Sequence, residues 1–415
     1  MRRMWPLTVR GTGALALAVG CFILAGELGV VELMYIGVLL LAMLAAAASS
    51  LYVVRRSDRV TRSLSPDVVA VGRNALVTAR IGVRTALASP PGVWRDTVPD
   101  SLGGRAEGVF PALGSGLRAG ERVVEISYEV TGMRRGVHSV GPLSVTSTDP
   151  FGLARRSTVF GEQTKITVAP AVTDLPPLTD YAGEAGGTLH TTTNQLGQGA
   201  DNLVARPYVS GDSMRRIHWR ASAHQGSLMV RQEEQESTPE ATVVLDRGVV
   251  RWAAEALRAP GADPGFEIAV AAAVSALTRL THDGYAVEVV DTDGTELAER
   301  IDGGDMTEVE RVVNQFATLT ARRGDQLPQL AHLFAGVMTG PVVLVVGRFD
   351  PADADAVAPI PHHSTMPILF AVAPRGDALE RAVEAGWHVA RIDPDADLSV
   401  AWASAAERGV SDVLG

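Results

Sequence analysis

The hydrophobic and polar positions divide the chain into stretches of different period. Two apolar runs without a charge come first, at residues 13–26 and 33–54, with a short acidic turn between them. The second run exceeds the ~20 residues that a helix needs to cross a bilayer. The first run reaches that length only if residues 7–12 join it and Arg10 extends its side chain to the interface. We therefore predict a hairpin of two transmembrane helices, with basic flanks, over residues 1–62.

A cleaved signal peptide is the alternative for the first run, because a basic start followed by a short apolar core fits both. A weak cleavage site and the second run directly behind it favour the hairpin. Basic residues precede the first run and follow the second: Arg2, Arg3, Arg10, Arg55, Arg56, Arg59 and Arg62. By the positive-inside rule we expect both ends of the hairpin, and the soluble domains, in the cytoplasm beneath the inner (plasma) membrane.

Residues 63–175 alternate between apolar and polar positions, as strands with one buried face do. Turn residues separate these segments at short intervals, which is typical of an antiparallel, immunoglobulin-like β-sandwich. Asp149 is expected to close a tight turn with its side chain, and Phe151 to plug one end of the sandwich. Arg134 and Arg135 fit a solvated hairpin tip as well as a binding role.

After residue 240 the period changes, and strands alternate with helices. This order predicts an α/β domain over residues 241–415, with a mainly parallel sheet covered on both faces. The strands are expected at residues 241–246, 285–290, 342–346, 367–372 and 388–392.

Residues 176–240 connect these two regions. The first part is loop-like, and the 206–236 segment is the densest mix of charged, aromatic and turn residues in the chain. Asp212 or Ser213 is expected to cap a short helix, because an acceptor side chain satisfies the free N–H groups of its first turn. Gly226 ends that helix, and a strand follows.

The 206–236 segment contains side chains that serve as general acids or bases in enzymes. They are Asp212, His218, His224, Glu233 and Glu234. Their spacing indicates no nucleophile–base pair, and a network of ion pairs explains the charged residues structurally. That network would join Arg206, Asp212, Arg216 and Glu236. Tyr208 and Trp219 fit interface anchors, since aromatic side chains dominate binding hot spots, and they fit domain-core packing equally.

Composition narrows the classes of function. The net charge of −10 and the pI near 5.4 argue against nucleic-acid binding, which usually needs a basic domain. The lone Cys21 excludes a disulfide within one chain. The sequence has no Gly-Lys-Ser or Gly-Lys-Thr of a phosphate-binding loop and no cluster of cysteines and histidines. We expect no ATP hydrolysis by the chain itself, no cofactor and no bound metal.

The 206–236 segment closely resembles the characteristic motif of the DUF58 family of bacterial proteins, whose function is unknown. The matching residues are Arg206, Tyr208, Gly211, Asp212, Arg216, Ile217, Trp219, Ser222, Ala223, Leu228, Val230, Arg231 and Glu236. His224 departs from the pattern, because members usually carry arginine there. The resemblance implies association with a MoxR-type AAA+ ATPase, and in some cases with a transglutaminase-like membrane protein.

The α/β region resembles a von Willebrand factor A domain, which DUF58 proteins often contain. In that fold a loop of the form Asp-x-Ser-x-Ser binds Mg²⁺ through hard oxygen donors. Here Asp246 is followed by Gly248 and Val250 at the two serine positions, so the resemblance implies a degenerate site without a functional metal. Arg247 is expected to bring a cation to the place of the metal. The alternative is an unusual metal site built from Asp246 and Asp350.

Together these patterns predict a multidomain membrane protein that acts as a non-catalytic scaffold or adaptor for the ATPase, with no catalytic residues. We expect its interaction surface to consist of Arg206, Tyr208, Gly211, Asp212, Arg216, Trp219, Arg231 and Glu236. One alternative is a membrane-bound hydrolase acting on cell-envelope material through Asp212, His218 and Glu233. A further alternative is an adhesion module that faces outward.

Overall fold

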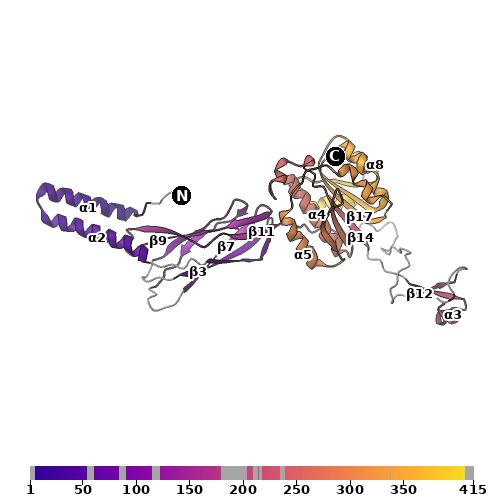
Figure 1. Ribbon diagram of the computed structural model, residues 1–415, viewed down its shortest axis with the longest axis horizontal. Coiled ribbons are helices and arrows are strands. Elements are labelled where there is room, and N and C mark those ends of the chain that lie inside the picture. The colour runs from indigo at the N-terminus through magenta and orange to yellow at the C-terminus, as the bar shows by residue number, and fades with distance from the viewer. Residues whose placement is uncertain are drawn as a thin grey trace. The chain divides into compact units, whose positions relative to one another are not determined.

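The computed structural model describes residues 5–53, 60–83, 90–114, 122–178, 203–208, 214, 217–233, 239–336 and 338–406. The chain divides into two compact units (Figure 1). The anchor unit comprises Met1–Ala171 together with Ala259–Ala262 and Val313–Leu319. The α/β unit comprises Val172–Arg258, Asp263–Val312 and Thr320–Gly415.

Two apolar helices open the anchor unit and form a hairpin (Figure 1). Helix α1 spans Val9–Leu28 and α2 spans Val31–Val53. Thr8 caps α1 by accepting the N–H of Gly11, and Gly29 ends it in the left-handed conformation, with φ of 66°. Both helices are long and apolar enough to cross a membrane by length and composition, with mean hydropathy of 1.7 and 2.2. This confirms the predicted pair of apolar helices, and it fits a membrane-associated protein.

Strands β1 to β11 of the anchor unit build small sheets, as the alternating pattern predicts. The sheet orders are β1-β3-β7-β5, β10-β9-β4-β6 and β2-β11-β8. In the described part of the chain, neighbouring strands of these sheets are antiparallel except β2 and β11, which are parallel. The strands are β1 Val60–Ser65, β2 Val68–Ala70, β3 Asn74–Val83, β4 Gly92–Asp96, β5 Leu102–Gly103, β6 Glu107–Phe110, β7 Arg122–Gly132, β8 Gly136–Val140, β9 Leu143–Thr148, β10 Arg155–Phe160 and β11 Thr164–Ala169.

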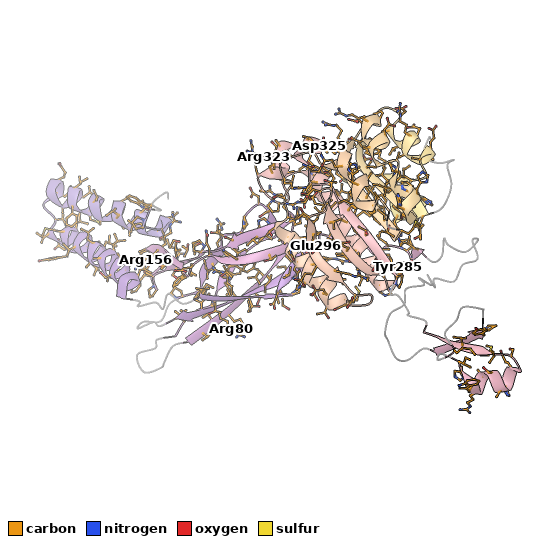
Figure 2. The ribbon with its side chains drawn as sticks, turned by 45° about the vertical axis from the view of Figure 1, so that its right-hand side comes forward. Arg80, Arg156, Tyr285, Glu296, Arg323 and Asp325 are labelled. Carbon is orange, nitrogen blue, oxygen red and sulfur yellow. The ribbon has the colours of Figure 1, made fainter. Side chains whose placement is uncertain are left out.

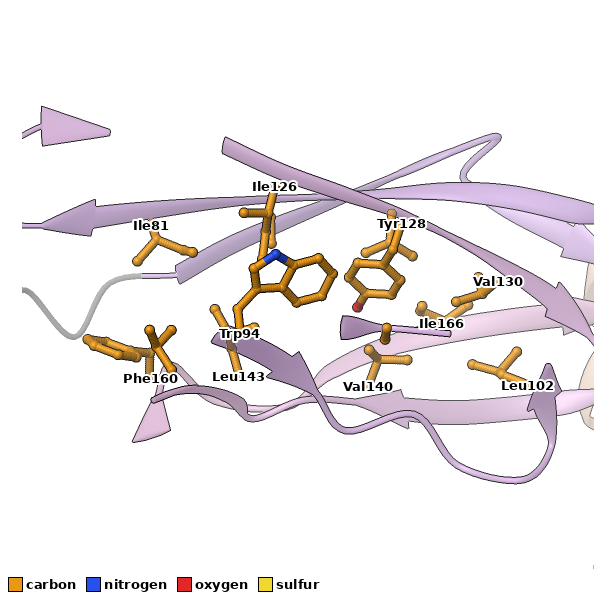
Figure 3. Packing of buried hydrophobic residues seen from close by; sticks show 14 of the residues in the cluster. Ile81, Trp94, Leu102, Ile126, Tyr128, Val130, Val140, Leu143, Phe160 and Ile166 are labelled. Carbon is orange, nitrogen blue, oxygen red and sulfur yellow. The ribbon is translucent and has the colours of Figure 1, made fainter. Parts of the chain in front are cut away.

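The inward side chains of these strands form one core, in which Trp94 and Tyr128 pack with ring centroids 5.6 Å apart (Figure 3). An ion pair lies inside the same sandwich. Arg62 Nε is 2.9 Å from Asp96 Oδ2, with side chains 2% and 0% exposed, and the Tyr128 hydroxyl donates to the same oxygen at 2.7 Å. Burial, followed by the hydrogen bond to Asp96, raises the pKa of Tyr128. Arg62 is therefore an internal residue of the sandwich and not a free basic flank of the hairpin.

Two further expectations about this unit are wrong in part. Arg135 is not solvated at a hairpin tip: it is fully buried and donates to the carbonyl of Phe316. Asp149 does close its turn, because its carboxylate accepts the N–H groups of Phe151, Leu153 and Ala154. Phe151, however, is 59% exposed and does not plug the sandwich.

The α/β unit contains a six-stranded sheet in the order β16-β15-β14-β17-β18-β19. All neighbours are parallel except β15 and β16. The strands are β14 Glu240–Leu245, β15 Ala286–Asp291, β16 Glu296–Ile301, β17 Thr339–Phe349, β18 Ser364–Pro374 and β19 His388–Arg391. The helices are α4 Pro264–His282, α5 Met306–Gln315, α6 Ala331–Phe334, α7 Pro351–Val357, α8 Ala378–Glu384 and α9 Leu398–Ala406.

Both faces of this sheet are covered, which explains its near-continuous apolar strands. On β17, Val342, Leu344 and Val346 pack into one core with residues of α7 and α8. The residues between them, Val343 and Val345, are also fully buried. Helix α4, which is buried along most of its length, packs against β14, β15 and β17. Because helices cover both faces, the carboxyl ends of the strands stay uncovered, and sheets of this kind generally bind ligands at these ends.

Candidate functional site

The 206–236 segment forms a small two-stranded element. Strand β12, Leu203–Pro207, pairs antiparallel with β13, Met229–Glu233, and Arg206 lies opposite Val230. Between them, Ile217 bridges to Val230 and α3 spans Trp219–Gln225. Ile217, Met229 and Val230 are buried and hold the element together.

Helix α3 begins at a different residue from the one predicted. Its N-cap is His218, whose Nδ1 accepts the N–H of Ala221 at 3.0 Å, and not Asp212 or Ser213. Gly226 ends the helix in the left-handed conformation, as predicted. Because the Nδ1 atom of His218 serves the helix, this histidine has a structural role that accounts for its position.

The described part of this segment exposes apolar side chains. Trp219 is 69% exposed, Met214 63% and Leu228 42%, while Tyr208 is half-buried. Four predicted interaction residues lie outside the described residues: Gly211, Asp212, Arg216 and Glu236. The side chains of Arg206 and Arg231 also lie outside them. The predicted ion-pair network therefore stays a prediction.

A second cluster lies at the carboxyl ends of the central strands of the α/β unit. Asp246 directly follows β14, and Asp291 is the last residue of β15, so the parallel pairing of the two strands brings them together. Both are fully buried. Asp246 Oδ1 accepts the N–H of Gly248 at 2.9 Å, and Asp291 Oδ1 accepts that of Thr292 at 2.7 Å.

Arg251 fills the space between the acidic side chains. It ends the short 3-10 helix Val249–Arg251, and its side chain is only 3% exposed. Its Nη2 donates to Asp353 Oδ1 at 2.5 Å, its Nη1 donates to Asp325, and its Nε lies 3.6 Å from Asp246 Oδ2. One guanidinium thus contacts three carboxylates; Asp325 is labelled in Figure 2.

Two more arginines close the cluster from the side of Asp291. Arg322 Nε is 2.6 Å from Asp291 Oδ2, and Arg322 Nη1 is 2.7 Å from Asp293. Arg247 Nη1 lies 3.8 Å from Asp291 Oδ2, and its Nε donates to the Thr320 carbonyl at 2.9 Å. The loop after β14 is fixed by its backbone as well, because Val249 donates to the Arg322 carbonyl at 2.8 Å.

The cluster shifts the protonation of its members. Burial raises the pKa of Asp246 to about 7, against the attraction of Arg251 and the hydrogen bond from Gly248. Burial also lowers the pKa of Arg251, but its hydrogen bonds to Asp325 and Asp353 outweigh this effect and raise it. Burial opposes the shift of Asp293, yet hydrogen bonds from Thr295 and Arg322 lower its pKa to about 2. Asp246 Oδ2 has no hydrogen-bond partner, so this oxygen is where a proton is best accommodated.

The loop after β14 leaves little space at Gly248. A Cβ on Gly248 would lie 2.9 Å from the Gly324 carbonyl and 3.1 Å from Asp246 Oδ1, so a serine requires the neighbouring loop to move. Val250 lies in the 3-10 helix and is 41% exposed. Asp350 is the N-cap of α7, in a capping box with Asp353, so helix capping accounts for its position. Among the described residues no group of three or more histidine, cysteine, aspartate or glutamate side chains is arranged to hold a metal ion.

Sequence reasoning singled out Asp246 and expected Arg247 to supply the cation, but Arg251 is the arginine that contacts Asp246, and Arg247 lies against Asp291. Asp291 could have been found, because it directly follows the strand predicted at residues 285–290, which pairs with β14. Arg251, Asp325 and Asp353 come from three separate loop or helix segments, and no spacing in the sequence connects them.

Comparison with known proteins gives one family match. Residues 204–298 match the model of the family described as protein of unknown function DUF58, which confirms the resemblance of the 206–236 segment. No curated protein matches the chain.

Three solved structures with similarity to part of this chain have low sequence identity to it. The CARDB domain of a protein from Pyrococcus furiosus is 17% identical, covering 26% of this chain and 93% of that one, with a TM-score of 0.17. A cohesin module of a Clostridium perfringens family 33 glycoside hydrolase is 11% identical, with coverage of 26% and 95% and a TM-score of 0.16. The DNA glycosylase AlkC of Pseudomonas fluorescens, bound to DNA, is 16% identical, with coverage of 26% and 30% and a TM-score of 0.15.

Proposed function

We propose that this DUF58 family protein is a membrane-anchored, non-catalytic scaffold that works with a MoxR-type AAA+ ATPase in the assembly or maturation of protein complexes. The observation that carries the proposal is the closure of the Asp246 cluster by Arg251. The place at the carboxyl ends of the strands, where a ligand or metal would bind, holds a guanidinium of the chain itself.

The α/β unit supports the degenerate von Willebrand A-like interpretation in two ways. Numbered along the chain, its strand order is 3-2-1-4-5-6, a doubly wound order, with the third strand antiparallel. The loop after its first strand has lost both hydroxyls, and Gly248 has no room for one. A domain of this kind would retain the fold as a binding platform without the metal.

The 206–236 segment is the proposed docking surface for the ATPase. Large side chains such as Trp219 and Met214 normally avoid water, and aromatic residues and arginines dominate binding hot spots. A hydrolase would need Asp212, His218 and Glu233 to converge, and the capping bond of His218 explains this residue without catalysis. A transglutaminase-like membrane protein would be a further member of the same assembly. We propose that the soluble units lie in the cytoplasm, where such an ATPase is found.

Capture of the ATPase from membranes tests this proposal. The full chain is purified from membranes under ATP-trapping conditions, and the amount of MoxR-type ATPase retained is quantified. We expect Trp219→Ala and Met214→Ala to reduce capture at least tenfold, because each removes an exposed anchor side chain. Met338→Ala is the matched control for Met214, since Met338 is 70% exposed elsewhere in the α/β unit. Undiminished capture by inserted, folded Trp219→Ala and Met214→Ala proteins would contradict the docking role.

A further inference from the structure

The start of helix α1 is joined to the Asp149 turn of the sandwich by backbone hydrogen bonds. Leu7 forms a β-bridge with Ala154, the Thr8 N–H donates to the Leu153 carbonyl at 2.9 Å, and the Arg155 N–H donates to the Pro6 carbonyl at 2.7 Å. These bonds extend the sandwich by a short piece of chain that runs directly into α1.

Packing makes this junction close and rigid. A Cβ on Gly11 would lie 1.9 Å from the Leu153 carbonyl oxygen, so only glycine lets α1 approach the turn this far. Leu51 of α2 is buried with Ala154 in a small apolar cluster. Arg156 donates to the Leu51 carbonyl at 3.0 Å, at the junction of helices and sandwich in Figure 2. The position of both helices along their axes is therefore fixed relative to the Asp149 turn.

Exposed aromatic and basic side chains surround this junction. Trp5 and Phe151 are each 59% exposed, and the Trp5 indole donates to Thr12 of α1 at 3.3 Å, so its ring lies along the start of the helix. Arg10 and Arg155 are also exposed. A Cβ on Gly152 would be 3.9 Å from Arg10 Nη1, which places this guanidinium over the Asp149 turn.

We propose that this collar, formed by Trp5, Arg10, Phe151 and Arg155, lies in the headgroup layer of the bilayer. The inference rests on the membrane anchoring in the proposed function and goes beyond it. Helix α1 has 20 residues, which corresponds to about 30 Å, the thickness of the hydrocarbon core. Its first turn is then level with one hydrocarbon boundary, and the hydrogen bonds hold the Asp149 turn at the same level.

The chemistry of the collar fits this layer of the membrane. Tryptophan and other amphipathic rings gather at the boundary between hydrocarbon and headgroups, and arginines there bind phosphate oxygens. The sandwich therefore stands directly on the membrane surface and is not held on a loose tether. The exposed Phe151 side chain, which does not pack inside the sandwich, inserts into the lipid and anchors the sandwich there.

Depth measurements with nitroxide labels test the inference on the full chain. In a Cys21→Ala background, single cysteines replace Phe151, Val19 or Leu76 and are spin-labelled. The protein is placed in nanodiscs of phosphatidylcholine and phosphatidylglycerol. Electron paramagnetic resonance then compares accessibility to oxygen, which concentrates in lipid, with accessibility to a water-soluble nickel chelate. Arg155→Cys provides a second label position on the collar.

Val19 reports on the anchor, because it is 50% exposed in the middle of α1. Leu76 is the water control, and it is 43% exposed. Leu76 lies far from the collar. Strand β10 leads away from the helix ends, and Gly161, which follows β10, packs on Val60 at the start of β1. Strand β1 then continues to Ser65, which pairs with Leu76. Two such strands span roughly 30 Å.

We expect the ratio of oxygen to nickel accessibility to be highest at position 19, intermediate at 151 and 155, and lowest at 76. Ratios at 151 and 155 equal to that at 76, with position 19 in lipid, would overturn the inference and leave the anchor intact. A water-like ratio at position 19 would overturn the anchor itself, and the inference with it.

Discussion

Replacing Arg251 by methionine removes one positive charge from a buried group of carboxylates. Arg251 is 3% exposed and contacts Asp353 and Asp246, whose side chains are 9% and 0% exposed. Breaking a buried ion pair by removing one partner costs about 3–5 kcal/mol, because the other charge is left without compensation in a medium of low dielectric constant. We therefore expect the region around β14 and α7 to lose about 3–5 kcal/mol at pH 8. Asp325, which is 41% exposed, adds little to this loss because water reaches it.

Hydrogen–deuterium exchange of the full chain measures this effect locally, which suits a protein of two units that need not unfold in one step. Peptides that cover β14 and α7 should lose protection in Arg251→Met and keep it in Arg391→Met. Arg391 is the matched control, since its pair with Asp393 is 61% and 57% exposed and worth about 0–1 kcal/mol. Adding Asp353→Asn to Arg251→Met should restore part of the protection. Equal protection in Arg251→Met and Arg391→Met would refute the argument that Arg251 neutralises this cluster.

Two further predictions concern the same loop. The pKa of Asp246 is about 7 in the folded chain, against the ordinary value of 3.8. The free energy of unfolding that protonated Asp246 contributes is therefore fully present below pH 4 and is lost as the pH rises through 7. The loss amounts to at most about 4 kcal/mol. Asp246→Asn should therefore flatten the fall in β14 protection between pH 5 and pH 8 (roughly one unit above the folded pKa), and an unchanged slope would show that Asp246 does not carry it. Gly248→Ser should destabilise the loop by about 1–3 kcal/mol, because the added atoms meet the Gly324 carbonyl. A melting temperature equal to that of the wild type would show that the loop yields freely.

The sequence predicts the regular elements well where one face of an element is buried. The two apolar helices follow from uncharged runs, and the antiparallel sheets follow from alternation, as in β3, where buried and exposed positions alternate. Strand β16 was missed, because Glu296, Glu299 and Arg300 break the apolar run at the edge of the sheet. The alternation of apolar strands with helices after residue 240 corresponds to the parallel pairings of the central sheet.

Buried charges were the main failure of sequence reasoning. Arg62 and Arg135 were interpreted as exposed, and Arg251 was not singled out, because an isolated arginine is rarely buried. Each is buried by partners distant in the chain: Asp96 for Arg62, the Phe316 carbonyl for Arg135 and Asp353 for Arg251. Local periodicity holds no information about such pairs.

The N-cap of α3 at His218 was missed for a different reason. Asp212 and Ser213 are stronger capping residues, and the chain begins α3 several residues later than propensity favours.

The interleaving of the two units limits how the gene can be cut. Ala259–Ala262 and Val313–Leu319 are encoded among the strands of the α/β unit but belong to the anchor unit. A fragment that stops at Ala171 would deprive Arg135 of the Phe316 carbonyl, and a fragment that starts at Val172 would separate two segments from the unit to which they belong. Division of the chain at this single junction would leave the anchor unit without two of its segments. Selection is therefore expected to have kept this pair of units together as one heritable block.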